Sequence, residues 1–177
     1  MKFKDTKYGD LTGQSYKGNI DVSDNKLTSL EGAPKEVFGF FDCSDNKLTS
    51  LEDAPKEVRG FFDCSKNKLT SLKGAPKEVH GDFYCNDNKL TSLEGAPKEV
   101  HGFFDCDDNH LTSLEGAPKL VRGDFSCSNN LNPNLNNEWD LRTENPDMTD
   151  DEIKSKMYEL TNDENYLSKE VQDIFLF

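Results

Sequence analysis

The sequence lacks the features by which most enzymes and membrane proteins are recognised. Hydrophobic residues make up 33% of its 177 residues, and no apolar run is long enough to cross a bilayer. The opening segment MKFKDTKYGD has no apolar stretch, so we expect no secretion signal and no contact with a membrane. GxSxG, HExxH and P-loop motifs are missing. We therefore expect a protein that is not an enzyme.

Clustered cysteines are missing as well. The five cysteines recur once every 21 residues, and no two of them form a C-x-x-C motif, which disfavours a zinc or iron–sulfur site. On parallel strands about 4.8 Å apart, identical side chains stack in register, where disulfide geometry is hard to reach. We expect buried, reduced cysteines, no cofactor and a reducing, cytoplasmic compartment. They are Cys43, Cys64, Cys85, Cys106 and Cys127.

Positive charge is scarce. The formal net charge is −13, and it is uneven: residues 1–131 carry 17 Lys and Arg against 22 Asp and Glu, whereas residues 132–177 carry 4 against 12. Binding to phosphate groups needs clustered positive charge, so we expect no direct nucleic-acid binding. An acidic chain could instead bind a basic partner, or mimic nucleic acid by occupying a DNA-binding cleft.

The sequence does contain one unit of 21 residues, repeated five times between Asn25 and Asn129 and beginning NKLTSLEGAPKEVFGFFDCSD. A repeat of this period predicts a solenoid, in which each unit buries its apolar face against its neighbours. A degenerate half-unit precedes the first copy. The nearly constant positions, numbered in one unit, are Asn46, Leu48, Leu51, Ala54, Pro55, Val58, Gly60, Phe62 and Cys64.

The segment V-x-G-x-F-x-C alternates, which predicts a short strand with one buried side. The opposite register would bury Asp42 and expose Cys43, so we expect Phe41 and Cys43 to face inward and Phe40 and Asp42 to face outward. The Asn column should lie where each strand ends, with its amide bonded to the backbone of its own and the adjacent coil. Leu-x-x-Leu then follows the far wall, and Ala-Pro turns the chain on the side without a sheet.

The motif F-x-C-x-x-N-x-L-x-x-L resembles the leucine-rich repeat signature L-x-L-x-x-N-x-L-x-x-L over roughly residues 16–135. The short unit with proline after its last leucine is similar to the compact bacterial and bacteriophage type, although it is one residue longer than that of the bacterial effectors. The resemblance implies a curved parallel β-sheet whose concave face binds macromolecules, little helix in the repeats, and no chemistry. It further implies an inhibitor or adaptor that acts on a host protein, such as a defence or nucleic-acid-processing enzyme, in the host cytoplasm.

Solenoids need caps, because a terminal coil otherwise exposes its stacking face and an unpaired edge. We expect residues 1–24 to form an N-terminal cap with the half-repeat, residues 25–135 the leucine-rich repeat array, and residues 136–177 an acidic, helical C-terminal cap.

Two helices are expected in the C-terminal segment. After Cys127 the repeat gives way to a loop rich in Asn and Pro, from which Trp139 is expected to cover the last coil. A capping box from Thr149 to Glu152 opens one helix, and a second is expected over about 164–175. Whether these helices only cap the solenoid or also insert into a partner stays open.

Three columns vary between units while the scaffold columns stay nearly fixed, and we expect them side by side on the solvent face of the sheet. After Val stand Lys17, Phe38, Arg59, His80, His101 and Arg122. After Gly stand Asn19, Phe40, Phe61, Asp82, Phe103 and Asp124. Between Phe and Cys stand Asp21, Asp42, Asp63, Tyr84, Asp105 and Ser126.

Outward phenylalanines are not explained by folding. Phe40 and Phe61 would stack across neighbouring strands, and exposed aromatics flanked by charge are typical of protein interfaces. The rings could instead lie under a cap, or be mere copies left by repeat duplication. We expect a surface for a partner protein made of Phe38, Phe40, Phe61, Phe103, Tyr84, Arg59, His80, His101, Arg122, Asp42, Asp63 and Asp105.

A metal-binding repeat protein is a further alternative. His80 and His101 stand on adjacent strands with Asp82 nearby, and two imidazoles with a carboxylate could hold zinc. The Asp column could hold calcium, but the glycine-rich ligand loops of calcium-binding repeats are missing. We therefore expect contacts to a partner, and no metal, at these residues.

Overall fold

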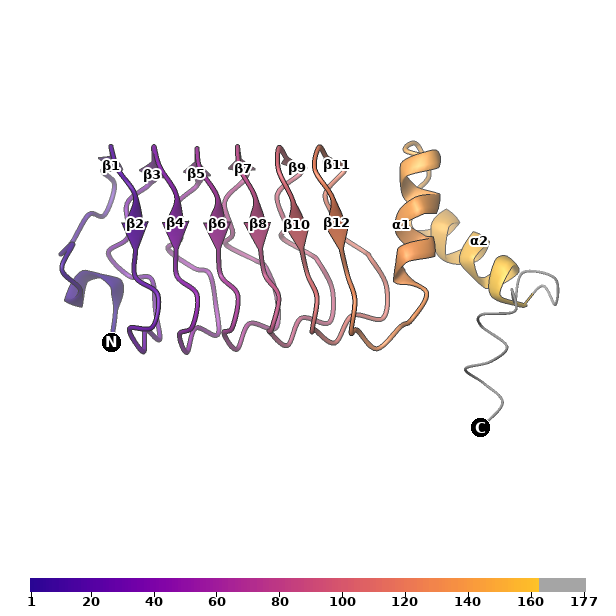
Figure 1. The fold of residues 1–177 in the computed structure, drawn as a ribbon, viewed down its shortest axis with the longest axis horizontal. Helices are drawn as coiled ribbons and strands as arrows, with labels where there is room; N and C mark the ends of the chain where they lie inside the picture. Colours follow the sequence, from indigo (N-terminus) through magenta and orange to yellow (C-terminus); the bar gives the residue numbers. More distant parts are fainter. Residues whose placement is uncertain (163–177) are drawn as a thin grey trace. The chain divides into compact units, whose positions relative to one another are not determined.

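The repeats fold as a parallel β-solenoid with one 21-residue unit in each coil (Figure 1). The computed structural model describes residues 1–162, with side chains as far as residue 158. No α-helix lies between residues 15 and 134, so the predicted solenoid with little helix in its repeats is confirmed.

Each coil contributes a short strand to each of two six-stranded parallel sheets. The first, here called the Glu sheet, contains β1 (Ser15–Tyr16), β3 (Glu36–Val37), β5 (Glu57–Val58), β7 (Glu78–Val79), β9 (Glu99–Val100) and β11 (Leu120–Val121). The second, the Phe sheet, contains β2 (Ile20–Asp21), β4 (Phe41–Asp42), β6 (Phe62–Asp63), β8 (Phe83–Tyr84), β10 (Phe104–Asp105) and β12 (Phe125–Ser126). Equivalent residues of successive units pair in register, as Phe41 does with Phe62.

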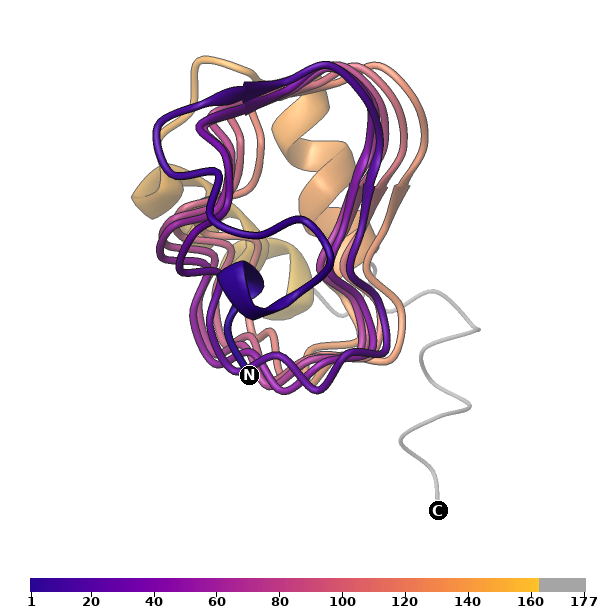
Figure 2. The ribbon, with the colours of Figure 1, turned by 90° about the vertical axis from the view of Figure 1, so that its left-hand side faces the viewer.

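The prediction of one strand over V-x-G-x-F-x-C, and so of one sheet, was wrong. The segment makes two strands of two residues, and the chain bends between them, so that the two sheets form adjacent sides of the coil (Figure 2). The bend forms at the glycine column, where successive backbones approach closely. A Cβ atom at Gly60 would lie 2.8 Å from the backbone nitrogen of Phe40, and Gly60 N–H donates to the Gly39 carbonyl at 2.9 Å. Only glycine allows the ladder to continue around this corner.

The inward phase of the core columns is confirmed. Phe41, Phe62, Phe83 and Phe104 are completely buried, as are the leucine columns and four of the five cysteines. The buried rings stack from coil to coil, with centroids 5.7 Å apart for Phe41 and Phe62 and 5.3 Å apart for Phe83 and Phe104. The free Cys43 thiol donates to the Asp63 carbonyl at 3.2 Å, and burial raises its pKa well above the usual value.

The Asn column forms the expected ladder. The Asn67 amide donates to the carbonyls of Cys64 and Ser65 in its own coil, at 3.2 and 3.0 Å. It also donates to the Cys43 carbonyl of the preceding coil at 3.0 Å, while its oxygen accepts the Leu48 N–H at 2.9 Å. One buried side chain therefore bonds four backbone groups from two coils, among them the buried Leu48 N–H.

One turn position departs from its column. Gly32, Gly74, Gly95 and Gly116 have φ between 82° and 97°, and the fifth member of the column, Asp53, has φ 66°. The left-handed conformation costs about 1–2 kcal/mol for an L-residue, and glycine at position 53 would remove this cost. Part of the resulting gain in stability is lost because glycine has more conformational freedom in the unfolded chain. We expect Asp53→Gly to raise the free energy of unfolding by about 0.5 kcal/mol, measured by urea denaturation. A loss of stability would contradict this reading of the turn.

The N-terminal residues lie against the first full coil. Phe3, in the short 3-10 helix η1 (Phe3–Asp5), is completely buried, and its ring stacks on Phe41 with centroids 6.1 Å apart. Phe3 N–H donates to the Ser29 carbonyl at 3.1 Å, and Leu11 N–H donates to the Gly32 carbonyl at 2.8 Å. The backbone groups and rings of the first coil thereby gain partners within the chain.

The chain divides into two compact units, residues 1–136 and 137–177. Helix α1 (Leu135–Glu144) begins where a loop was expected, so that expectation was wrong over these residues. The sequence of α1 lacks the regular spacing of hydrophobic residues from which an amphipathic helix is predicted. Its helix is instead supported by the ion pair of Arg142 with Glu138 at 2.8 Å, one turn apart.

Helix α2 (Asp150–Asn162) begins at the predicted capping box. Thr149 N–H donates to the Glu152 carboxylate at 2.8 Å, and Glu152 N–H donates back to the Thr149 hydroxyl at 3.3 Å. The helix expected over 164–175 lies outside the described residues, and the capping role of this segment stays a prediction. Across residues 1–162, none of the helices has the length and apolar character needed to span a bilayer.

Candidate functional site

The three variable columns lie at the bend between the sheets and on the adjoining Phe sheet. Because the coils stack in register, each column runs along the solenoid as a row. The aromatic row is Phe40, Phe61, Tyr84 and Phe103. The carboxylate row is Asp42, Asp63 and Asp105 on the strands of the Phe sheet. The cationic row is Arg59, His80, His101 and Arg122, with Phe38 at its start.

The aromatic row is continuous over four coils. Phe40 and Phe61 stack nearly parallel, with centroids 4.5 Å apart and an interplanar angle of 8°. Tyr84 follows at 6.3 Å from Phe61, and Phe103 at 6.0 Å from Tyr84, both in tilted or edge contacts. All four side chains are half-buried, whereas the rings one residue after each phenylalanine are fully buried. The expected stacking of Phe40 on Phe61 is confirmed.

Tyr84 enters the row because the coil that contains β8 exchanges two positions. Three coils read Phe-Phe-Asp, with Phe before the strand and Asp on it, but this coil reads Asp82-Phe83-Tyr84. The Tyr84 hydroxyl donates to Asp82 at 3.0 Å, and the same carboxylate accepts the Phe103 N–H at 2.8 Å. Asp82 was not among the residues predicted for the partner surface, although aligning the repeats shows the exchange of ring and carboxylate.

The carboxylate row is bonded within its own turns. Asp42, Asp63 and Asp105 each accept a backbone N–H two residues ahead, at 2.9, 2.8 and 2.9 Å. Burial raises the pKa of Asp63 and of Asp105 above the ordinary value, and neighbouring carboxylates such as Asp42 raise the pKa of Asp63 further. Within residues 1–158, no ion pair reaches these three side chains.

A raised pKa in the folded state means that the charged form of Asp63 opposes folding at neutral pH. Stability is then gained as the pH falls through the folded-state pKa, because the folded chain binds the proton more tightly. We expect Asp63→Asn, which keeps the oxygen that accepts the Ser65 N–H, to raise the melting temperature at neutral pH. The difference from the unmodified protein should shrink on acidification, in thermal scans at several pH values. A lower melting temperature of the Asp63→Asn variant at neutral pH would contradict this prediction.

Two members of the cationic row, Arg59 and His80, lie beside glutamates of the Glu sheet. The Arg59 guanidinium lies 4.2 Å from the Phe38 ring centroid and contacts Glu36 at 2.9 Å and Glu57 at 3.2 Å. The ring of His80 lies 5.1 Å from that of His101, and His80 Nε2 lies 4.0 Å from the Glu78 carboxylate. Arg122 is exposed one coil further along.

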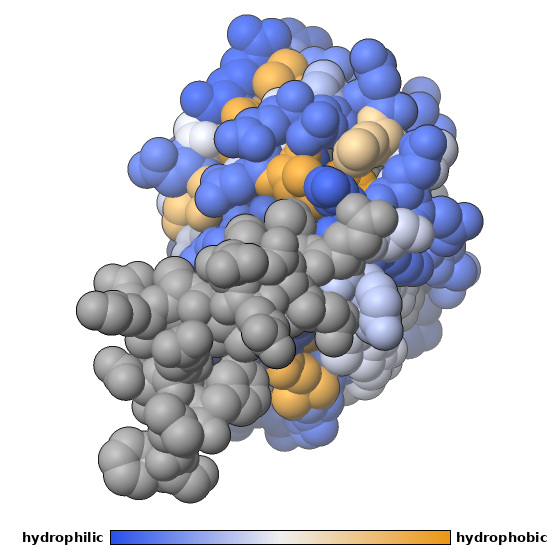
Figure 3. Space-filling model, turned by 90° about the vertical axis from the view of Figure 1, so that its right-hand side faces the viewer, coloured by the Kyte–Doolittle hydropathy of each residue, from blue (hydrophilic) through white to orange (hydrophobic). Residues whose placement is uncertain are grey.

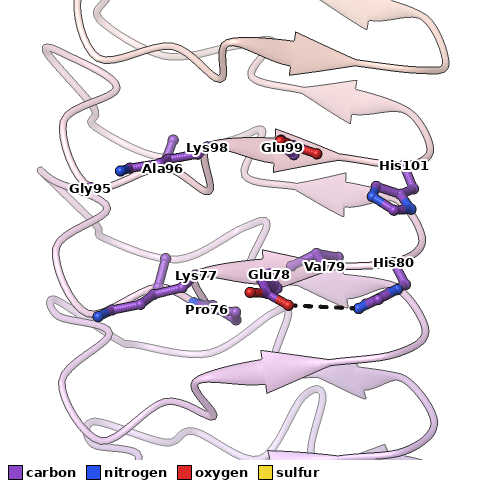
Figure 4. A pocket seen from close by; sticks show the side chains of 11 residues that line it. Pro76, Lys77, Glu78, Val79, His80, Gly95, Ala96, Lys98, Glu99 and His101 are labelled. Carbon is purple, nitrogen blue, oxygen red and sulfur yellow. Dashed lines mark ion pairs between the residues drawn. The ribbon is translucent and has the colours of Figure 1, made fainter.

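A hollow of about 630 Å³ adjoins the cationic row, over the strands β7 and β9 (Figure 4). Its polar side chains come from two adjacent coils, with Lys77, Glu78 and His80 on one and Lys98, Glu99 and His101 on the next. In the described part of the chain, no three His, Cys, Asp or Glu side chains are grouped so as to hold a metal ion. Asp82, placed with the two histidines by sequence, instead accepts hydrogen bonds from Phe103 and Tyr84.

Among the described residues, the exposed large hydrophobic side chains outside the rows lie apart in the sequence. On the face drawn in Figure 3, hydrophobic residues form small separate areas among hydrophilic ones. Leu131 and Tyr158, for example, are 66% and 71% exposed. Single exposed apolar residues are ordinary on soluble folds, whereas four contiguous rings are not.

Comparison with models of protein families, with curated proteins and with solved structures found no match to this chain. The fold by itself places the chain in the class of parallel β-solenoid repeat proteins.

Proposed function

We propose that this protein is a non-catalytic binding protein and that a partner protein docks on the aromatic row and the two rows beside it. The observation that carries the proposal is the parallel stack of Phe40 on Phe61, half-buried on the outer side of the coil. Rings in this position lie outside the core, which Phe41 and Phe62 fill from the inner side. Contiguous rings bordered by charge have the composition of interface hot spots.

The class of partner follows from the resemblance to short bacterial and bacteriophage leucine-rich repeats. We propose a protein of the host cell as partner, with this chain as its inhibitor or as an adaptor. The five cysteines are buried and free, and a reducing compartment such as the cytoplasm keeps thiols in this form. The carboxylate row also supports a second candidate, a mimic of nucleic acid, in which charge rather than the rings would carry binding.

The double variant Phe40→Ser/Phe61→Ser tests the proposal by capture from host lysate, with immobilised protein. We expect it to lose at least tenfold in captured partner, because both stacked rings are removed, while its melting temperature falls by only several degrees. Leu131→Ser is the matched control, since it removes an exposed apolar side chain away from the row.

Undiminished capture by the double variant would overturn the docking surface. If capture also fell steeply with added salt, the mimic of nucleic acid would be the better account.

A further inference from the structure

Each of four successive coils presents one ring and one carboxylate at the candidate site. Three coils place the ring before the strand of the Phe sheet and the carboxylate on it, as Phe61 and Asp63 do. The coil of β8 exchanges them, with Asp82 before the strand and Tyr84 on it, and still contributes one of each. Ring and carboxylate therefore occur together even where the residue order is reversed, which indicates that the combination is what the surface requires.

The candidate surface carries an excess of negative charge. Asp63 lies in register beside Asp42 and Tyr84, and Asp105 lies on the other side of Tyr84. Like charges on adjacent strands repel, and no ion pair within residues 1–158 relieves them. Arg59 does not compensate, because its guanidinium is already paired with two glutamates.

The molecule contains its own example of the contact that such a surface favours. The guanidinium of Arg59 lies over the Phe38 ring, at 4.2 Å from its centroid, and is held there by carboxylates at 2.9 and 3.2 Å. A planar guanidinium can stack on a ring and bond a carboxylate at the same time, which an ammonium group does less well. The aromatic row and the carboxylate row offer the same two kinds of partner, a ring and a carboxylate. Within the described residues, however, no guanidinium is paired with them.

We propose that the partner docks through an arginine-rich segment, whose guanidinium groups stack on the aromatic row and pair with the carboxylate row. This inference rests on the proposed function and names the chemistry of the partner. The raised pKa values of Asp63 and Asp105 agree with it, because an arriving cation would relieve the cost of keeping both carboxylates charged.

The test uses the full chain and three fluorescein-labelled peptides of equal length, with alternating Arg and Gly, Lys and Gly, or Glu and Gly. Fluorescence anisotropy is expected to show that the Arg peptide binds more tightly than the Lys peptide, and that the Glu peptide does not bind. Asp63→Asn/Asp105→Asn should lower the affinity for the Arg peptide at least tenfold, and Phe61→Leu should lower this affinity as well.

Asp24→Asn/Asp87→Asn is the matched control, since it removes two charges from exposed turns outside the row. We expect it to change the affinity less than twofold. Equal weakening by both double variants would show general attraction to an acidic protein and would overturn the inference, as would an Arg peptide that binds no better than the Lys peptide or does not bind.

A captured host partner separates this inference from the proposed function. If capture depends on Phe40 and Phe61 but is unchanged in Asp63→Asn/Asp105→Asn, the docking surface stands and the arginine-rich partner is wrong. If the amount of captured partner is unchanged in both double variants, the assignment of the docking surface itself is wrong. Melting curves decide whether the aspartate variant is folded, and we expect it to be at least as stable as the original protein, because repulsion within the row is removed.

Discussion

Asn67→Ala is expected to lower the free energy of unfolding by about 3 kcal/mol, because the buried Leu48 N–H loses its partner and three carbonyls each lose one of two hydrogen bonds. The amide of Asn67 bonds three carbonyls from two coils, and its oxygen accepts the Leu48 N–H. Alanine can replace none of these bonds, and water has no access to the buried groups. Urea denaturation monitored by circular dichroism measures the loss.

Asn86→Ala, in the next coil, is the matched control for the same chemical change. The Asn86 side chain is half-buried, and its amide donates to the neighbouring Asp87 carboxylate at 3.1 Å. We expect a loss below about 1 kcal/mol, as for an ordinary partly exposed hydrogen bond. Similar losses in the two variants would mean that the Asn ladder does not hold the coils together.

Phe62→Ala and Phe61→Ala are expected to differ sharply, although the two residues are adjacent in the sequence. Phe62 is completely buried between Phe41 and Phe83, with centroids 5.7 and 5.4 Å away, so its removal leaves a cavity that costs about 3–5 kcal/mol. Phe61 loses only its outer stacking contacts, so we expect a cost near 1 kcal/mol. Paired denaturation curves give both values.

The same comparison at Phe103 and Phe104 serves as an internal repeat, since these residues occupy the equivalent positions two coils further on. If the first residue of either pair proved as costly to remove as the second, the outer rings would be part of the core. The proposed docking surface would then lose its main argument.

Much of the fold was predictable because its rules are local and repeated. The 21-residue period determined the solenoid, and the cost of burying Asp42 determined which side of the chain faces inward. The Asn ladder followed from a polar residue recurring at the end of an apolar strand. The stacking of Phe40 on Phe61 followed from strand register.

The features that were missed depend on contacts between coils. The bend that separates the two sheets arises where Gly60 meets the backbone of Phe40 from the preceding coil, and alternation along one strand does not encode that approach. The pairing of Arg59 with Glu36 also joins two coils. Helix α1 was missed for a different reason, because its polar sequence has no hydrophobic period and follows Pro133 in an Asn-rich segment.

Photocrosslinking from position 61 tests the docking surface most directly. With p-benzoylphenylalanine in place of Phe61, in host lysate, we predict a covalent adduct with one partner protein, and loss of that adduct when Phe40→Ser is added. The same probe at Thr70, an exposed residue outside the three rows, should give no such adduct. No adduct from position 61, or the same adduct from both positions, would contradict the assignment of the aromatic row as the binding surface.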